Sequence, residues 1–152
     1  MVDKSKEVVI VGAVRTAIGT FNGSLKLMEA YKLGSIVISE VLKKSEFSGD
    51  EVDEVIMGQV LTSGSGQNPA RQAAIHAGIS ISKPAFLVNQ VCGSGLRAVI
   101  LGYQSIKLGD VKNVITGGQE SMSLAPHSIM YRNKKKFLEK ELVDTMIKDG
   151  LT

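Results

Sequence analysis

The only cysteine of this 152-residue chain lies in the segment NQVCGSGLRAV, residues 89–99. Cys92 follows an apolar run and precedes Gly-Ser-Gly at the expected start of a helix. The first N–H groups of a helix have no partners inside it and form the positive end of its dipole. A thiol at such a position ionises more readily than a free cysteine, and the thiolate is the nucleophilic form. Cys92 is therefore a candidate nucleophile.

The chemistry that best suits this setting is acyl transfer. The same N–H groups can bind the oxyanion that forms when a thiolate attacks a carbonyl. Gly93 and Gly95 keep the approach free of side chains. The alternative is that Cys92 is a small buried apolar residue, as many free cysteines are. The residues alone leave both interpretations open.

Other catalytic loops fit the sequence poorly. A cysteine-dependent phosphatase needs one more residue between its cysteine and arginine than the four that separate Cys92 from Arg97. No Gly-x-Gly-x-x-Gly follows the first apolar run, and GSGQNPARQ lacks the Gly-Lys-Ser/Thr of a nucleotide-binding loop. We interpret His76, within an apolar helix, as structural, whereas His127 in APHS could approach a ligand. With no second ligand at a useful spacing, we predict no metal site.

The elements that must position Cys92 alternate between strand and helix. The expected strands are 7–14, 54–60, 84–91 and 112–118. The expected helices are 30–44, 69–77, 93–108 and one around 138–148. The helix over 93–108 should have an apolar side formed by Leu96, Val99, Ile100, Tyr103 and Ile106. The alternation predicts a layered α/β domain with a largely parallel sheet.

Composition argues against several classes of protein. The net charge is +3, and apart from the run NKKK, which we interpret as solvated, the positive charge is spread out. We therefore expect no nucleic-acid partner. The first apolar run is too short for a signal peptide or a membrane span, so we expect no membrane association. One cysteine forms no internal disulfide, and we take the cytoplasm as the default location.

Several segments together resemble the thiolase family. NQVCGSGLRAV resembles its active-site segment, Asn-x-x-Cys-x-Ser-Gly-x-x-Ala/Ser. VRTAIGTFNGSL is similar to the first strand and loop, and VIMGQVLTSGSGQNPARQAA to the second strand and helix. GGQESMSLAPH matches the Gly-Gly-x-Glu-Ser/Asn-Met-Ser turn, and DTMIKDGLT is similar to the loop domain of the biosynthetic, acetoacetyl-CoA-forming branch. These matches run in order from Val8 to Thr152.

The resemblance implies acetyl-CoA C-acetyltransferase chemistry. Cys92 would carry the acetyl group as a thioester, and its backbone N–H would form part of an oxyanion hole. Leu151 falls where the family packs a leucine against the pantetheine of CoA, and Asn89 and Ser94 would hold the loop. The partners would be acetyl-CoA, acetoacetyl-CoA and CoA, used as substrates, with no separate cofactor. A longer-chain 3-ketoacyl-CoA thiolase is the alternative within the family.

The resemblance also implies an incomplete protein. We expect a thiolase-like layered α/β/α fold, an incomplete N-terminal half with a mostly parallel mixed sheet, an unpaired sheet edge and an uncovered apolar helix face. Residues 1–121 would form the N-terminal core and 122–152 the beginning of a truncated loop domain. The family's Gly-His-Pro histidine, Cys-x-Gly cysteine and Asn-Glu-Ala-Phe segment belong to a second half, and none occurs here.

These expectations leave two hypotheses. In the first, the chain is the front of a thiolase, inactive alone and active when a C-terminal half, in the same or a separate chain, completes it. The complete protein would be a homodimer or homotetramer. In the second, the chain is a non-catalytic module that binds CoA or a thiolase subunit. The ending MIKDGLT has no capping element, which favours the first hypothesis.

Overall fold

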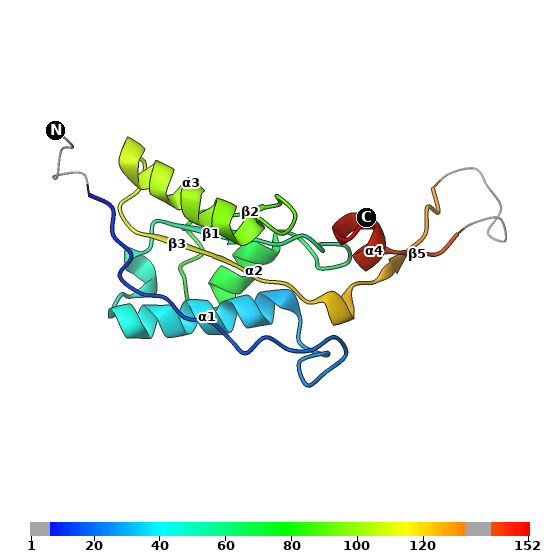
Figure 1. The fold of residues 1–152 in the computed structure, drawn as a ribbon. Helices are drawn as coiled ribbons and strands as arrows, with labels where there is room; N and C mark the ends of the chain where they lie inside the picture. Colours follow the sequence, from blue (N-terminus) through cyan, green and yellow to red (C-terminus); the bar gives the residue numbers. More distant parts are fainter. Residues whose placement is uncertain (1–6, 133–140) are drawn as a thin grey trace.

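Three parallel strands form the central sheet of this computed structural model, which describes residues 7–132 and 141–152 (Figure 1). The strands are β1 (Glu54–Gly58), β2 (Ala85–Val88) and β3 (Val114–Gly118), in the order β2-β1-β3. In the register, Met57 lies opposite Leu87 on one side and Gly117 on the other. The central strand is buried on both faces, as expected of parallel strands between helices. The expected mixed sheet is entirely parallel within the described residues.

Helices cover both faces of this sheet. Helices α1 (Ala30–Ser45) and α2 (Pro69–His76) lie on one face and α3 (Ser94–Leu108) on the other (Figure 1). The main core lies between β1 and the first two helices, and it includes Ile38, Leu42, Val55, Met57, Ala70 and Ala73. The layered α/β/α architecture is confirmed.

The helix ends follow the predicted signals. Asn68 caps α2 by accepting a hydrogen bond from the Arg71 N–H at Oδ1 (3.1 Å), and Pro69 occupies the first helical position. Gly109, in the left-handed region at φ 86°, ends α3. The limits of the three strands and of helices α1, α2 and α3 lie within a few residues of those predicted.

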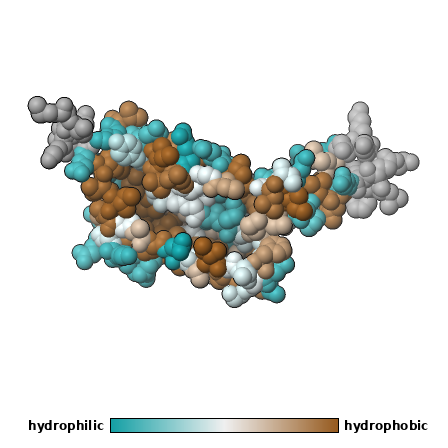
Figure 2. Space-filling view, viewed as in Figure 1, coloured by the Kyte–Doolittle hydropathy of each residue, from teal (hydrophilic) through white to brown (hydrophobic). Residues whose placement is uncertain are grey.

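The predicted apolar side of α3 does not face the sheet. The exposed fraction of Leu96 is 68% and that of Tyr103 is 50%, whereas Ala98 is fully buried. A Cβ added at Gly102 would approach Thr116 Cγ2 at 2.5 Å, so the helix axis lies close to β3. Such close packing requires small residues beneath the helix, and the large apolar residues therefore point outward. The expected uncovered helix face is present (Figure 2).

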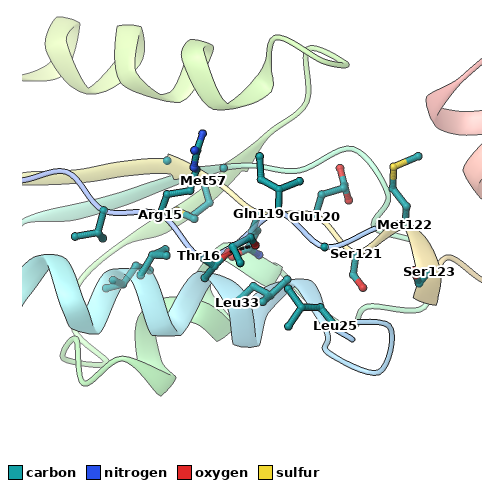
Figure 3. Close-up of a pocket in the computed structure, with 18 of the residues that line it drawn as sticks. Arg15, Thr16, Leu25, Leu33, Met57, Gln119, Glu120, Ser121, Met122 and Ser123 are labelled. Atoms are coloured by element: carbon teal, nitrogen blue, oxygen red, sulfur yellow. Dashed lines mark hydrogen bonds between the residues drawn. The ribbon is translucent and has the colours of Figure 1, made fainter. Parts of the chain in front are cut away.

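The predicted first strand, 7–14, is wrong for this structure. The segment forms no strand, and Val9 and Ile10 are 65% and 80% exposed. A strand needs a neighbour about 4.8 Å away, but two cavities of about 410 and 530 Å³ separate residues 7–21 from β3. Figure 3 shows the larger one, lined by Arg15 and Thr16 on one side and by Gln119 on the other. Among the residues that the structure describes, β3 pairs only with β1, so the expected unpaired edge is also present.

The C-terminal part contains a hairpin of two short strands, which was not predicted. It joins β4 (His127–Ser128) to β5 (Val143–Asp144), which pair antiparallel, and α4 (Thr145–Gly150) follows. Asp144 caps α4 by accepting the Met146 N–H at 2.9 Å. Of the helix predicted around 138–148, residues 138–140 lie outside the described residues, and the described helix begins only at Thr145. The predicted domain boundary at residues 121/122 stays a prediction.

Candidate active site

A cavity of about 410 Å³ lies beyond the carboxyl ends of the three strands. The loops that follow β1, β2 and β3 each contribute to its lining. The connection after β1 leads to β2 on one side of that strand, and the connection after β2 leads back across it to β3 on the other side. In α/β proteins, ligands bind in the crevice where the strand order reverses in this way. The cavity is lined by Gly58, Gln59, Val60, Leu61, Val91, Cys92, Ser94, Gly95, Gly118, Gln119, Glu120, Met122, Met146, Gly150 and Leu151.

Cys92 is exposed and lines this cavity from the turn between β2 and α3. In this chain, Cys92 is therefore not a buried apolar residue. The Cys92 N–H has no hydrogen-bond acceptor among the described residues. Cys92 precedes α3, and no side chain caps the first N–H groups of that helix. A thiol and an unpaired N–H on one residue, at a helix start, form the minimal arrangement for attack on a carbonyl and for stabilising the oxyanion.

The turn that holds Cys92 begins earlier than predicted, because β2 ends at Val88 rather than at residue 91. The Gly93 N–H donates to the Gln90 carbonyl at 3.0 Å, and the Ser94 N–H donates to the Val91 carbonyl at 3.1 Å. These bonds fold residues 89–93 into a compact turn, which we call the cysteine turn. It leads directly into α3.

Three glycines allow α3 to approach the strands closely. A Cβ added at Gly58 of β1 would lie 2.5 Å from the Gly95 N and 2.6 Å from the Ser94 O. A Cβ added at Gly118 of β3 would lie 3.3 Å from the Gly95 Cα. The first turn of α3 is therefore in backbone contact with the ends of both strands. This contact fixes the position of the cysteine turn over the cavity.

Leu151, at the end of α4, lines the same cavity as Cys92 although it lies 59 positions further along the sequence. Leu151 is 59% exposed, so its side chain is available for contact with a ligand. Met146 of α4 and Met122 also line this cavity. The two site residues predicted from the sequence are thus brought together at one cavity with apolar walls.

A buried polar network, which sequence reasoning missed, supports the cavity wall. Glu120 accepts hydrogen bonds from the Val60 N–H (2.8 Å) and the Leu61 N–H (3.2 Å). Gln59 donates to the Leu61 carbonyl at 2.8 Å, and Gln119 donates to the Gln59 Oε1 at 2.8 Å. Figure 3 shows Gln119 and Glu120 in succession at the end of β3. Burial raises the pKa of Glu120, against the opposing effect of its N–H donors.

This raised pKa predicts a specific pH dependence of stability. Above pH 4.5, the ordinary pKa of the carboxyl, the folded state binds more protons at Glu120 than the unfolded state. The free energy of unfolding should therefore fall as pH rises from 4.5 through the folded-state pKa. Glu120→Gln should remove this contribution, as measured by urea unfolding of the 152-residue chain over that pH range. An unchanged slope would show that folding does not perturb Glu120.

Asp53→Asn is the control, because the pH dependence of stability expected at Asp53 has the opposite sign. Asp53 accepts the Lys112 N–H (2.8 Å) and the Asn113 N–H (3.0 Å), and these bonds lower its pKa. Its stabilising contribution is therefore present above pH 3.8 and is lost as pH falls through the lowered folded-state value.

Neither histidine lines the Cys92 cavity. His76 packs against Tyr31 with ring centroids 5.0 Å apart, and its Nδ1 lies 2.8 Å from the Gln72 carbonyl, which agrees with a structural role. His127 lies 3.8 Å from Asp144 across the hairpin. Within residues 7–132 and 141–152, no three His, Cys, Asp or Glu side chains lie close enough to hold a metal ion. None of the helices in these ranges is both long and apolar enough to span a bilayer.

Comparison with known proteins places this geometry in a family. Residues 8–152 match the family described as Thiolase, N-terminal domain. The chain is 53% identical over 145 residues to the acetyl-CoA acetyltransferase of Rhizobium meliloti, covering 95% of this chain and 37% of the relative. It is 51% identical over 148 residues to the cytosolic acetyl-CoA acetyltransferase of Rattus norvegicus, covering 97% of this chain and 37% of the relative.

The fold agrees with these matches. The crystal structure of Acat5 thiolase from Ascaris suum in complex with coenzyme A superposes with a TM-score of 0.87 at 38% sequence identity. The superposition covers 92% of this chain and 36% of the Ascaris chain. The chain thus spans somewhat more than a third of the length of the relatives it matches. It belongs to the thiolase family, whose N-terminal domain it matches over residues 8–152.

Proposed function

We propose that this chain supplies the acyl-accepting part of an acetyl-CoA C-acetyltransferase of the thiolase type. The observation that carries the proposal is the exposed Cys92 with its unpaired N–H, in a cavity that Leu151 also lines. The relatives named acetyl-CoA acetyltransferase, about 50% identical, support the substrate. Activity requires the remaining part of a thiolase, and we predict negligible activity for residues 1–152 alone.

In the first step, the Cys92 thiolate attacks the carbonyl carbon of acetyl-CoA. The Sγ–carbon bond forms as the bond from that carbon to the CoA sulfur breaks. CoA leaves as a thiolate that takes up the proton lost by the Cys92 thiol. The Cys92 N–H, aided by the positive end of the α3 dipole, stabilises the negative charge on the carbonyl oxygen. The product is an acetyl thioester on Cys92.

In the second step, a second acetyl-CoA loses a methyl proton to a base outside this chain. The resulting carbanion forms a carbon–carbon bond with the acetyl carbonyl carbon, and Cys92 departs as a thiolate. The products are acetoacetyl-CoA and the free enzyme, and thiolysis by CoA is the reverse reaction. Leu151 would contact the pantetheine of the CoA thioester in both steps. The similar Ascaris thiolase was crystallised in complex with coenzyme A, which supports this ligand.

A chimera tests this function directly. In it, residues 1–152 replace the corresponding part of the Rhizobium meliloti enzyme, which supplies the remaining length. We expect the chimera to cleave acetoacetyl-CoA in the presence of CoA and to condense acetyl-CoA. Ping-pong kinetics would indicate the covalent acyl-enzyme intermediate. Faster cleavage of longer 3-ketoacyl-CoA thioesters would instead favour a longer-chain thiolase. A folded chimera without thiolysis of either substrate would contradict the proposal.

We further propose that the complete protein is a cytoplasmic homo-oligomer. The cytosolic name of the rat relative supports the location, as does a single exposed thiol that needs no oxidising compartment. The outward apolar residues of α3, such as Leu96 and Tyr103, support burial against another surface. We expect the chimera to elute as a dimer or tetramer in size-exclusion chromatography with light scattering.

A further inference from the structure

Val91, directly before Cys92, has an unusual backbone conformation. Its φ is +49°, in the left-handed region. The other non-glycine residues with positive φ within the described ranges are Asn22, Asn68 and the helix-capping Glu46. Asparagine adopts this conformation readily, whereas a β-branched residue does so only under constraint. Such constraint is concentrated at functional sites, where the surrounding structure maintains it.

Packing of the Val91 side chain does not provide this constraint, because the residue is 52% exposed. Two neighbouring side chains hold its backbone, in addition to the Ser94 N–H, which donates to the Val91 carbonyl at 3.1 Å. The Val91 N–H donates to the Asn89 Oδ1 at 2.9 Å. The Val91 carbonyl accepts a hydrogen bond from the Ser94 hydroxyl at 2.6 Å. Both polar groups of Val91 are thus bound by side chains, one from each side of the turn.

Ser94 and Asn89 are themselves tied to the surrounding structure. Ser94 is only 4% exposed, and its Oγ also accepts the Gln90 N–H at 2.9 Å. The Asn89 Nδ2 lies 3.5 Å from the Val60 carbonyl, in the loop whose N–H groups bind Glu120. The hydrogen bonds around Val91 therefore connect the start of α3 to the loop after β1. These elements form two walls of the Cys92 cavity.

We propose that Asn89 and Ser94 are positioning residues that keep Val91 left-handed and thereby set the direction in which Cys92 presents its Sγ and its N–H to the cavity. Only the kinetic consequence of this inference rests on the proposed function. Without either side chain, Val91 should relax toward negative φ. The thiol and the N–H would then turn away from the acyl group together.

Glycine at position 91 provides a decisive test, because glycine adopts positive φ without strain. In the chimera, Asn89→Ala and Ser94→Ala should each lower kcat by about 10- to 100-fold. KM should change little, since neither residue is placed against the CoA moiety. With Val91→Gly alone as the reference, adding Asn89→Ala to Val91→Gly should lower kcat far less than Asn89→Ala lowers it in the wild type. Val91→Ala is the matched control, because it removes the side chain but keeps the strain, and it should give no recovery.

A backbone measurement on the 152-residue chain separates this inference from the proposed function. Scalar couplings and Cα chemical shifts should report a positive φ at residue 91 in the wild type and its loss in Asn89→Ala and Ser94→Ala. If the wild-type chimera is inactive, the proposed function fails, and these NMR data still decide the inference. Equal recovery by glycine and alanine, or a positive φ that persists in both variants, would overturn it. Should one variant not fold, the other carries the test.

Discussion

Replacing Cys92 by alanine should abolish acyl transfer in the chimera. Alanine has no group that can form the thioester, so both condensation and thiolysis lose their covalent intermediate. Removal of a catalytic nucleophile lowers kcat on the order of 10⁴- to 10⁶-fold in enzymes that act through acyl intermediates. Stability should change little, because Cys92 is exposed and lies outside the core. The measurement is the rate of acetoacetyl-CoA thiolysis at saturating CoA.

Cys92→Ser is the matched control for this loss. Serine has nearly the same size and keeps the backbone N–H, so the oxyanion site and substrate binding should survive while the weaker nucleophile fails. We expect near wild-type binding of CoA by calorimetry and little turnover. Thiolysis within tenfold of the wild type in either variant would show that the reaction does not pass through Cys92.

Replacing Gly58 by alanine should damage both stability and catalysis. The added Cβ would lie within 2.5–2.6 Å of backbone atoms of Ser94 and Gly95, where no flexible side chain can yield. Relieving this steric clash requires α3 to move away from β1, and the cysteine turn must move with the helix. Overpacking of this kind costs about 1–3 kcal/mol. A displacement near 1 Å at the nucleophile lowers the rate by about 100-fold.

Gly95→Ala tests whether the position rather than the loss of a glycine matters. A Cβ at Gly95 would lie 3.7 Å from the Gly118 Cα, an ordinary contact. Because alanine favours helices over glycine by up to about 1 kcal/mol, this variant should be as stable as the wild type or slightly more stable. Urea unfolding of the two variants provides the comparison, because it does not depend on access to Cys92. Equal stability of Gly58→Ala and Gly95→Ala would contradict the close packing of α3 against β1.

Local signals in the sequence predicted most of the architecture. The Asn68-Pro69 start of α2 and the Gly109 end of α3 were correct, because capping and left-handed glycine depend on nearby residues alone. Burial of β1 was also predictable from its unbroken apolar run. These signals suffice to locate Cys92 after a strand and before a helix.

Features that depend on distant segments were not predicted from local patterns, and the uncovered helix face was expected only from the resemblance. The outward apolar residues of α3 form a good helical pattern, and only the close approach of β3 to Gly102 explains why the opposite, small-residue face is buried. Residues 7–14 have the composition of a strand, but no neighbouring strand lies within pairing distance. Pairing across β4 and β5 joins two short segments that have no strand pattern of their own.

The candidate site was predicted in part. Its position between a strand and a helix made Cys92 a candidate nucleophile, whereas Leu151 came only from the resemblance, since nothing in the sequence relates α4 to the cysteine turn. The hydrogen bonds of Glu120 and the left-handed backbone of Val91 were missed. Glu120 stands in the turn matched to the family motif, but a motif match reveals neither buried hydrogen bonds nor a backbone dihedral angle. The roles of Cys92 and Leu151 stay predictions until they are measured.

The most direct test of the central claim is the mass of the protein after brief exposure to acetyl-CoA at neutral pH. The chimera would be quenched in acid, and peptide mapping would locate any added acetyl group. We predict one acetyl group on the peptide that contains Cys92, lost on addition of CoA and absent from Cys92→Ala. An unmodified Cys92 in a chimera that turns over acetyl-CoA, or an acetyl group on another residue only, would contradict the account.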